Sequence, residues 1–205
     1  MEELAPGVFA GPRLPGANCY LIREGEVTVL VDAGMPGDHR RLADWLESEA
    51  IRLDVVLLTH GDVDHRGRAG ELARMHGAEV WAAEGERPFL TGGLRPRRLL
   101  RRVMVHLIRP VPVDRWLTAN DQVAGFTVWE TPGHTLGHIS LVRQEDRVVL
   151  AGDALVVGRQ GPTLAARWVN EDQAAAAESG QRLCQIQPTL LLTGHGPPWR
   201  PEAGA

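Results

Sequence analysis

The chain has 205 residues, a formal net charge of −4 and a hydrophobic fraction of 43%, which is typical of a globular protein that can bury a core without staples. The negative balance excludes a global electrostatic attraction to nucleic acid or to an anionic membrane. All 22 basic residues are arginine, so chemistry that needs a lysine, such as a Schiff base or a Walker-type phosphate loop, is excluded as well.

The sequence shows no targeting or membrane-spanning segment. Met1-Glu2-Glu3 lacks the basic start of a signal peptide, and no apolar run reaches about 18 residues. We therefore expect a cytoplasmic protein. Cys19 and Cys184 fit no metal or redox spacing and lie in apolar stretches, so both are expected to be buried and unreactive.

The first part of the chain predicts strands and then an alternation of strands and helices. In chain order we expect strands at 18–22 and 27–31, a helix after Pro36-Gly37, a strand at 54–58, a helix at 66–76 and a strand at 80–83. The run at 54–58 is wholly apolar after its first residue, which is typical of a strand covered on both faces.

Residues 84–118 interrupt this alternation. Prolines bracket the stretch 97–108, in which apolar residues form one helical face and arginines another. We therefore expect an arginine-rich helical insertion at about 84–118. Its arginines would suit a solvated outer face, a lid that favours anionic substrates, or a contact with a dimer partner, a membrane surface or nucleic acid.

Strands return after the insertion. They are expected at 126–131, 139–143, 148–151 and 189–193, with a helix at 171–186. No repeat, low-complexity linker or shift in composition marks a second domain. The pattern predicts a single domain over residues 1–205, of the α/β class, with two sheets and helices outside them.

Potential metal ligands follow four of the apolar strands. The candidates are His60, Asp62, Asp64 and His65 after the first of these strands, and then His134, Asp153 and His195. Imidazole nitrogen and carboxylate oxygen are ligands that borderline divalent ions accept together. Seven candidates are too many for one closed tetrahedral site and suit two open sites, in which paired ions about 4 Å apart activate a water.

These motifs resemble the metallo-β-lactamase superfamily. The resemblance rests on Thr59-His60-Gly61-Asp62-Val63-Asp64-His65, Pro132-Gly133-His134-Thr135, Gly152-Asp153 and Gly194-His195-Gly196, and on their order and spacing. It implies an αβ/βα four-layer sandwich of two mixed β-sheets with helices on the outer faces. Within the superfamily, the short single-domain form is similar to the glyoxalase II-like hydrolases.

The resemblance also implies a division of the ligands between two divalent ions. One ion takes His60, Asp62 and His134, the other takes Asp64, His65 and His195, and Asp153 bridges them. The usual residue at position 62 is histidine, so Asp62 adds a negative charge. Zinc is the expected metal, and the additional carboxylate also favours manganese or iron; a vacant first site is the alternative.

The implied function is a metal-dependent hydrolase in which a metal-bound hydroxide attacks an ester-like carbonyl, with Asp64 as the catalytic residue that orients the nucleophile. A thioester or lactone is the first expectation. A phosphodiesterase or nuclease of the same fold, an iron-dependent sulfur oxidoreductase and a non-catalytic binding module are the alternatives. We expect a small-molecule substrate, anionic if the arginine-rich helix covers the site, and no membrane or nucleic-acid partner; a homodimer stays open.

Two further residues are expected to support the site without binding metal. Asp32 is interpreted as a carboxylate that holds a histidine ligand from behind. His138 is interpreted as structural, although it lies four residues after His134. Of the three serines, none lies in the G-x-S-x-G pattern of a nucleophilic hydrolase.

Overall fold

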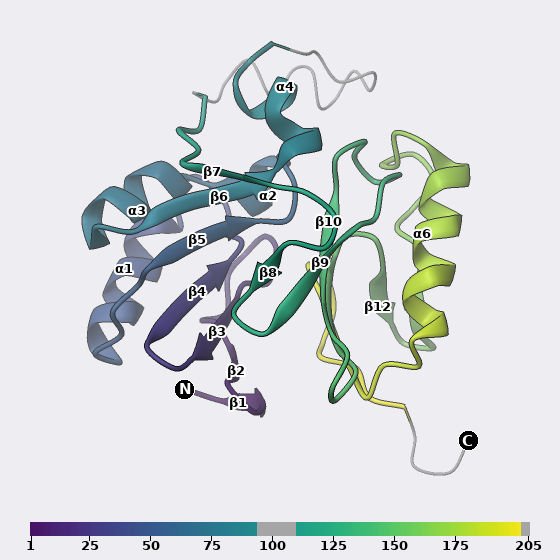
Figure 1. The fold of residues 1–205 in the computed structure, drawn as a ribbon, viewed down its shortest axis with the longest axis horizontal. Helices are drawn as coiled ribbons and strands as arrows, with labels where there is room; N and C mark the ends of the chain where they lie inside the picture. The colour runs from purple at the N-terminus through teal and green to yellow at the C-terminus, as the bar shows by residue number, and fades with distance from the viewer. Residues whose placement is uncertain (94–109, 202–205) are drawn as a thin grey trace. The chain divides into compact units, whose positions relative to one another are not determined.

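The structure is a computed structural model that describes residues 1–93 and 110–201. Contacts divide the chain into two compact units, Met1–Leu117 and Thr118–Ala205. Each unit is built on its own mixed sheet (Figure 1). The expectation of a single domain over residues 1–205 stays a prediction beside this division, and the expected arginine-rich helix at 97–108 lies outside the described residues.

The first unit contains a seven-stranded sheet whose strands follow chain order. Its strands are β1 (Glu3–Ala5), β2 (Val8–Ala10), β3 (Tyr20–Glu24), β4 (Val27–Val31), β5 (Val55–Leu58), β6 (Glu79–Ala83) and β7 (Arg115–Leu117). Pairing is antiparallel from β1 to β4 and parallel from β4 to β7. All four residues of β5 are buried, as expected for a strand covered on both faces.

Short helices connect the parallel strands of this unit. They are α1 (His39–Ser48), α2 (Val63–Arg66), α3 (Ala69–His76), the 3-10 helix η1 (Glu84–Glu86) and α4 (Arg87–Leu90). Helices α1 and α3 lie side by side against the sheet (Figure 1). Leu42, Leu46 and Leu72 share one buried cluster with Leu30 and Leu58 of the strands, so the core of this unit lies directly behind the end of β5.

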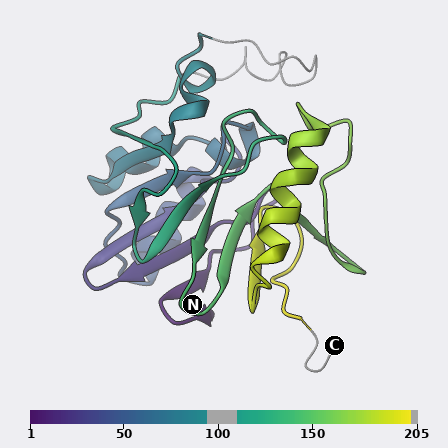
Figure 2. The ribbon, with the colours of Figure 1, turned by 45° about the vertical axis from the view of Figure 1, so that its right-hand side comes forward.

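The second unit contains a five-stranded sheet and one long helix. In spatial order the strands are β14 (Leu190–Thr193), β11 (Val148–Gly152), β10 (Ile139–Arg143), β9 (Phe126–Glu130) and β8 (Gln122–Val123). Only β11 and β14 pair in parallel. Helix α6 (Gln173–Gln185) runs beside these strands (Figure 2), with Leu183 in a buried cluster with Val149 and Leu191. Strands β12 (Val156–Gly158) and β13 (Gly161–Thr163) form a separate hairpin.

The structure adds elements that the sequence patterns did not predict, and it corrects one cysteine. Strands β1, β2, β7, β8, β12 and β13 have at most three residues each, too few to show a periodic pattern. Strand β7 places the end of the expected insertion at 84–118 inside the first sheet. Cys19 is buried, but the expectation for Cys184 is wrong: it is exposed, because α6 buries the face that carries Leu183 and leaves Cys184 outside it.

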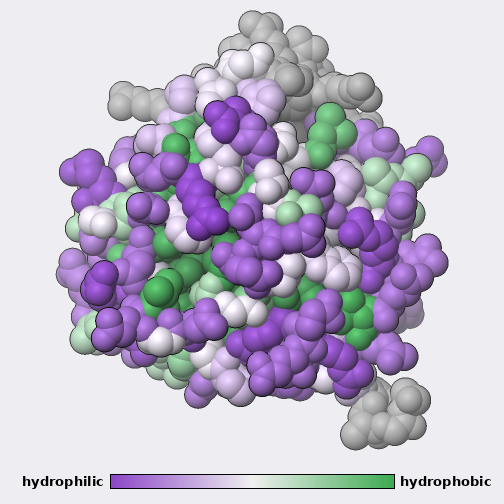
Figure 3. All heavy atoms as spheres, in the orientation of Figure 1, coloured by the Kyte–Doolittle hydropathy of each residue, from purple (hydrophilic) through white to green (hydrophobic). Residues whose placement is uncertain are grey.

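Hydrophilic residues cover most of the face drawn in Figure 3, with small apolar patches between them. The large hydrophobic side chains that are exposed among the described residues are Met1, Val27, Met75, Leu136 and Trp168. Within residues 1–93 and 110–201, no helix combines the length and the hydropathy that crossing a bilayer requires.

Candidate functional site

Four of the candidate ligands lie at the end of β5 in the first unit. The chain leaves the strand at Leu58, bends at Thr59 and His60, and enters α2, which carries Asp64 and His65, after the extended Asp62. The rings of His60 and His65 lie 4.1 Å apart, centroid to centroid, and both side chains are buried. The structure thus brings these two histidines together, although five positions separate them in the sequence.

Asp32, at the end of β4, lies beneath both histidines and is itself buried. Its carboxylate accepts hydrogen bonds from the Thr59 backbone N–H at 2.9 Å, from the Thr59 hydroxyl at 2.9 Å, and from Nδ1 of His65 at 2.8 Å. The residue has φ +63°, a left-handed conformation that aspartate tolerates better than most residues. The expectation that Asp32 holds a histidine from behind is therefore confirmed.

This network determines where the protons of the two imidazoles lie. An ionised carboxylate only accepts, so His65 carries its proton on Nδ1. The Thr59 hydroxyl donates its proton to Asp32, so at 3.0 Å from His60 Nδ1 it accepts from that ring. In the neutral form of both rings, Nε2 is then the nitrogen with a lone pair, which is the form that binds a metal ion.

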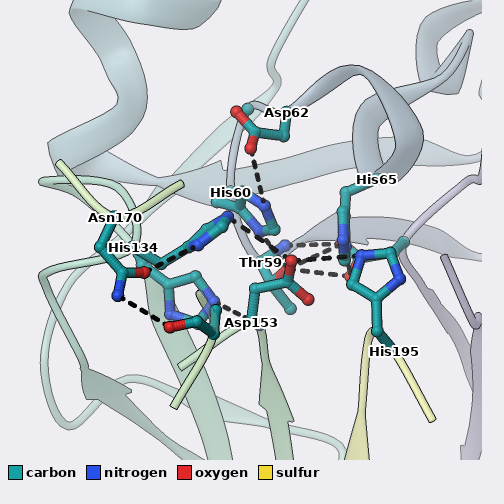
Figure 4. A network of polar contacts seen from close by, with 12 residues as sticks. Thr59, His60, Asp62, His65, His134, Asp153, Asn170 and His195 are labelled. Carbon is teal, nitrogen blue, oxygen red and sulfur yellow. Dashed lines mark hydrogen bonds and ion pairs between the residues drawn. The ribbon is translucent and has the colours of Figure 1, made fainter. Parts of the chain in front are cut away.

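Asp62 and Asp64 complete the acidic part of this cluster. Asp62 Oδ2 lies 3.8 Å from His60 Nε2 (Figure 4). Both carboxylates are half-buried. A Cβ built on Gly16 would lie 3.1 Å from Asp64 Cβ, so the loop between β2 and β3 packs tightly against the base of the Asp64 side chain.

Two charged residues beside this cluster were not expected from the sequence. Glu86 is buried and accepts a hydrogen bond from the Gly61 backbone N–H at 3.0 Å. Arg66 is 1% exposed, and its guanidinium lies 5.6 Å from the centre of the Phe89 ring. Burial lowers the pKa of Arg66, while the negative charges of Asp62 and Glu86 act against that shift. Arg66 thus places a positive charge beside the carboxylates of Asp62 and Glu86.

The other three candidates lie together in the second unit. Asp153 Oδ2 is 3.5 Å from His134 Nε2 and 3.3 Å from His195 Nε2. Asp153 and His134 are buried, whereas the His195 side chain is 41% exposed. Gly152, in the left-handed region at φ +51° and at an irregularity in the pairing of β11 with β14, turns the chain toward Asp153.

His138, directly before β10, supports Asp153. Its Nε2 accepts the Asp153 backbone N–H at 2.9 Å, so its proton lies on Nδ1, 2.8 Å from the Thr131 hydroxyl. Thr131 passes a hydrogen bond on to Ser140 at 2.9 Å, and Ser140 donates to the Ala151 carbonyl. Both ring nitrogens are therefore used within the fold, and the structural interpretation of His138 is confirmed.

Asn170 is a third residue that the motifs did not indicate. Its Oδ1 lies 3.3 Å from Nδ1 of His134 (Figure 4), and the residue is buried. It lies 36 positions from His134 and belongs to none of the ligand motifs. The nearest signal in the sequence is Asp172, two residues later, which caps the start of α6 and indicates a helix boundary but no contact with His134.

The donor sets within each unit suit a divalent ion. Ligand atoms about 2.05 Å from a tetrahedral ion lie roughly 3.3 Å from one another. The separations of 3.3 and 3.5 Å around Asp153 Oδ2 match that value, and the 3.8 Å between His60 Nε2 and Asp62 Oδ2 is slightly wider. The buried imidazoles present Nε2 and the carboxylates supply negative charge, so the residues present fit a metal.

Comparison with known proteins agrees with this chemistry. Residues 13–202 match the family described as the metallo-beta-lactamase superfamily. The chain is 32% identical to a probable metallo-hydrolase of Bacillus subtilis, YflN, over 96% of its own length and 86% of the relative's. It is 31% identical to the hydroxyacylglutathione hydrolase GloC of Haemophilus influenzae, over 87% and 85% of the two chains. The crystal structure of TTHA1623 in a di-iron-bound form has a TM-score of 0.76 and 27% identity, with 94% of each chain covered.

Proposed function

Because this chain belongs to the metallo-β-lactamase superfamily, we propose that it is a metal-dependent hydrolase that acts on an ester-like carbonyl, with thioesters and lactones as the first candidates. The observation that carries the proposal is the arrangement of imidazole Nε2 atoms in each unit. His60 and His65 have their Nδ1 protons engaged beneath them, and His134 and His195 both face one oxygen of Asp153.

We assign seven residues to two divalent ions. His60, Asp62 and His134 would hold one ion, Asp64, His65 and His195 the other, and Asp153 would bridge them. The three carboxylates leave a net charge of +1 against two divalent cations. Zinc suits the imidazole-rich set, and Asp62 also favours harder ions such as manganese or iron(II). Bound ions of this kind lower the pKa of coordinated water and polarise a substrate carbonyl.

The chain's own residues have separable tasks in this proposal. Asp64 accepts a hydrogen bond from the attacking water through a carboxylate oxygen and receives its proton. Asp32 and Thr59 hold the rings of His65 and His60, and His138 fixes the backbone of Asp153. The names of two relatives support hydrolysis as the reaction class, and a hydroxyacylglutathione is a thioester.

The proposal is tested by metal analysis followed by a hydrolysis screen. Protein purified without added ions is analysed by elemental mass spectrometry, loaded with zinc, manganese or iron(II), and assayed on thioesters, lactones and phosphodiesters. Asp64→Asn and His134→Ala should each lower turnover at least about 100-fold. His39→Gln serves as the control and should retain activity. His39 is the first residue of α1, and its Nδ1 makes a hydrogen bond with the Pro36 carbonyl.

The outcomes separate the alternatives. Turnover of thioesters or lactones that Asp64→Asn abolishes supports the proposal, and phosphodiester cleavage would replace it with the phosphodiesterase interpretation. Oxygen uptake on persulfides by iron-loaded protein would indicate the sulfur oxidoreductase. Unchanged turnover in both Asp64→Asn and His134→Ala would contradict the assigned site.

A further inference from the structure

The segment before α6 is bound to the loop that carries His134. The backbone N–H of Glu171 donates to the His134 carbonyl at 3.1 Å, and that of Asp172 donates to the Gly133 carbonyl at 2.9 Å. From within α6, the Ser179 hydroxyl donates to the Pro132 carbonyl at 2.8 Å. These contacts fix the His134 backbone against the start of the helix.

The approach is close enough to require a glycine before the histidine. Gly133 has φ +134°, and a Cβ built on it would lie 2.1 Å from the Ala176 backbone nitrogen. Asp172 caps the helix by accepting from the backbone nitrogens of Ala174 and Ala175 at 2.9 and 3.0 Å. A capped helix end is a firm support, so a side chain immediately before the cap has a defined position relative to His134.

Asn170 occupies that position, and its own contacts fix the orientation of its amide. Nδ2 donates to Gln173 Oε1 at 2.8 Å and to the Ala165 carbonyl at 3.3 Å. Both donor hydrogens are therefore used away from the histidine, and Oδ1 is the atom that faces His134. The residue is 1% exposed, so water does not compete for these contacts.

An amide oxygen can only accept a hydrogen bond. At 3.3 Å from Oδ1, Nδ1 of His134 must therefore carry a proton, and in the neutral ring Nε2 keeps its lone pair. Nε2 is the atom that faces Asp153 Oδ2 at 3.5 Å. The direction of every hydrogen bond from Gln173 through Asn170 to His134 thus agrees with one tautomer.

We propose that Asn170 is a positioning residue that selects the Nδ1-protonated tautomer of His134 and holds its ring, and that Gln173 orients the Asn170 amide for this purpose. The part of the proposal that concerns metal affinity rests on the proposed role of His134 as a ligand, and the part that concerns the tautomer does not. Substitution of a residue that hydrogen-bonds a metal-binding histidine commonly lowers metal affinity about 10- to 100-fold.

The test compares three substitutions in the full-length chain. Asn170→Leu has a similar volume and no acceptor, Asn170→Asp retains an acceptor toward His134, and Gln181→Leu changes an exposed residue of α6 as the control. Long-range proton–nitrogen NMR correlations on the metal-free protein report the tautomer of His134. Chelator competition with zinc reports the number of ions bound and their dissociation constants.

We expect wild type, Gln181→Leu and Asn170→Asp to show the Nδ1-protonated tautomer, and Asn170→Leu to lose it. We also expect Asn170→Leu to raise the dissociation constant of one zinc ion about 10- to 100-fold, and Asn170→Asp to restore tight binding. An Nε2-protonated His134 in the wild type, or an unchanged tautomer and zinc affinity in Asn170→Leu, would overturn the proposal.

Two additional variants keep the result decisive. If Asn170→Leu does not fold, Gln173→Leu removes the nearer of the two acceptors that orient the amide and should produce a mixture of His134 tautomers; a single unchanged tautomer there would contradict the proposal. If Asn170→Leu changes the tautomer but His134→Ala binds two zinc ions as tightly as the wild type, the assigned ligand set fails while the positioning role stands. The reverse result, in which only His134→Ala weakens zinc, rejects the positioning role alone.

Discussion

The two units support their histidines in different ways. In the first unit, a single buried carboxylate, Asp32, receives hydrogen bonds from Thr59 and from His65. In the second unit, the supports are neutral: the Asn170 amide holds His134, and the His138 imidazole holds the backbone of Asp153.

The difference shows that a defined tautomer does not require a charged partner. A buried carboxylate forces its donors to be protonated toward it but is costly to bury. A chain of neutral hydrogen-bond donors and acceptors fixes the tautomer as well and avoids the cost of burying a charge, provided that every group in the chain has a partner. We therefore expect stability in the first unit to depend on one residue, and in the second unit on several residues that each contribute less.

The largest effect is expected for Asp32→Ala. The substitution leaves Thr59 and His65 without their buried acceptor and places alanine at φ +63°, which should reduce the free energy of unfolding by about 3–5 kcal/mol. Asp32→Asn keeps the shape and tolerates this φ, and should cost less. Urea denaturation measures both, with the exposed Asp44→Ala as control; equal stability of the alanine and asparagine variants would show that the amide acceptor and the tolerance of φ +63° contribute nothing.

Gly133→Ala should have the next largest effect. The new Cβ would approach the Ala176 backbone nitrogen at 2.1 Å in addition to the backbone strain at φ +134°, so a loss of about 2–4 kcal/mol is expected. Gly25→Ala is the matched control, because Gly25 has φ +58° and a Cβ added there would meet no atom within 4 Å. Similar thermal denaturation of the two variants would mean that the loop does not depend on its contact with α6.

His138→Leu tests the neutral support of the second unit. It removes the acceptor of the buried Asp153 N–H and the donor to Thr131, and should cost about 1–3 kcal/mol in denaturant titrations. It should also lower zinc affinity, because the backbone of Asp153 loses its fixed position. His76→Leu, on the half-exposed end of α3, is the control; unchanged zinc affinity in His138→Leu would limit that residue to stability alone.

The smallest effect concerns the charged pair of the second unit, which lies away from the histidines. Arg143 donates to both carboxylate oxygens of Asp146, at 2.9 and 2.7 Å. Burial alone would raise the pKa of Asp146, but the hydrogen bonds and charge of Arg143 and two backbone N–H groups lower it overall. A depressed pKa in the folded state stabilises the protein at pH values above the unfolded pKa of about 4, and this contribution disappears as the pH falls through the folded pKa.

Arg143→Met should therefore lower stability by less than about 1 kcal/mol at pH 7, and by progressively less below about pH 4. Methionine retains apolar packing near Phe126, over which the guanidinium lies at 4.8 Å. Urea denaturation over this pH range, with Asp146→Asn measured in parallel, checks the prediction. A stability difference between wild type and Arg143→Met that stays constant down to acid pH would show that packing, and not the charge, is responsible.

Much of the architecture was predictable because the long strands and helices bury regular apolar faces. Strand 27–31 was predicted with the bounds that β4 has, and strand 139–143 with those of β10. The candidate ligands were equally predictable, because each histidine or aspartate motif directly follows a stretch that the sequence predicts as a strand. The exposed Cys184 was missed because a local apolar stretch does not reveal which side of an amphipathic helix a residue occupies.

By itself, the sequence determined the family, the α/β class and the positions of the candidate ligands, because these depend on local patterns and on motif spacing. A supporting role for Asp32 was also expected, but only the tertiary structure decided which histidine it holds, and the contacts of Asn170 and Glu86 were visible there alone. Asp32 lies 33 positions from His65, Asn170 lies 36 from His134, and Glu86 lies 25 from Gly61. Hydrogen bonds over such separations are created by the pairing of strands and the docking of a helix, and no periodicity within a short window of residues encodes them.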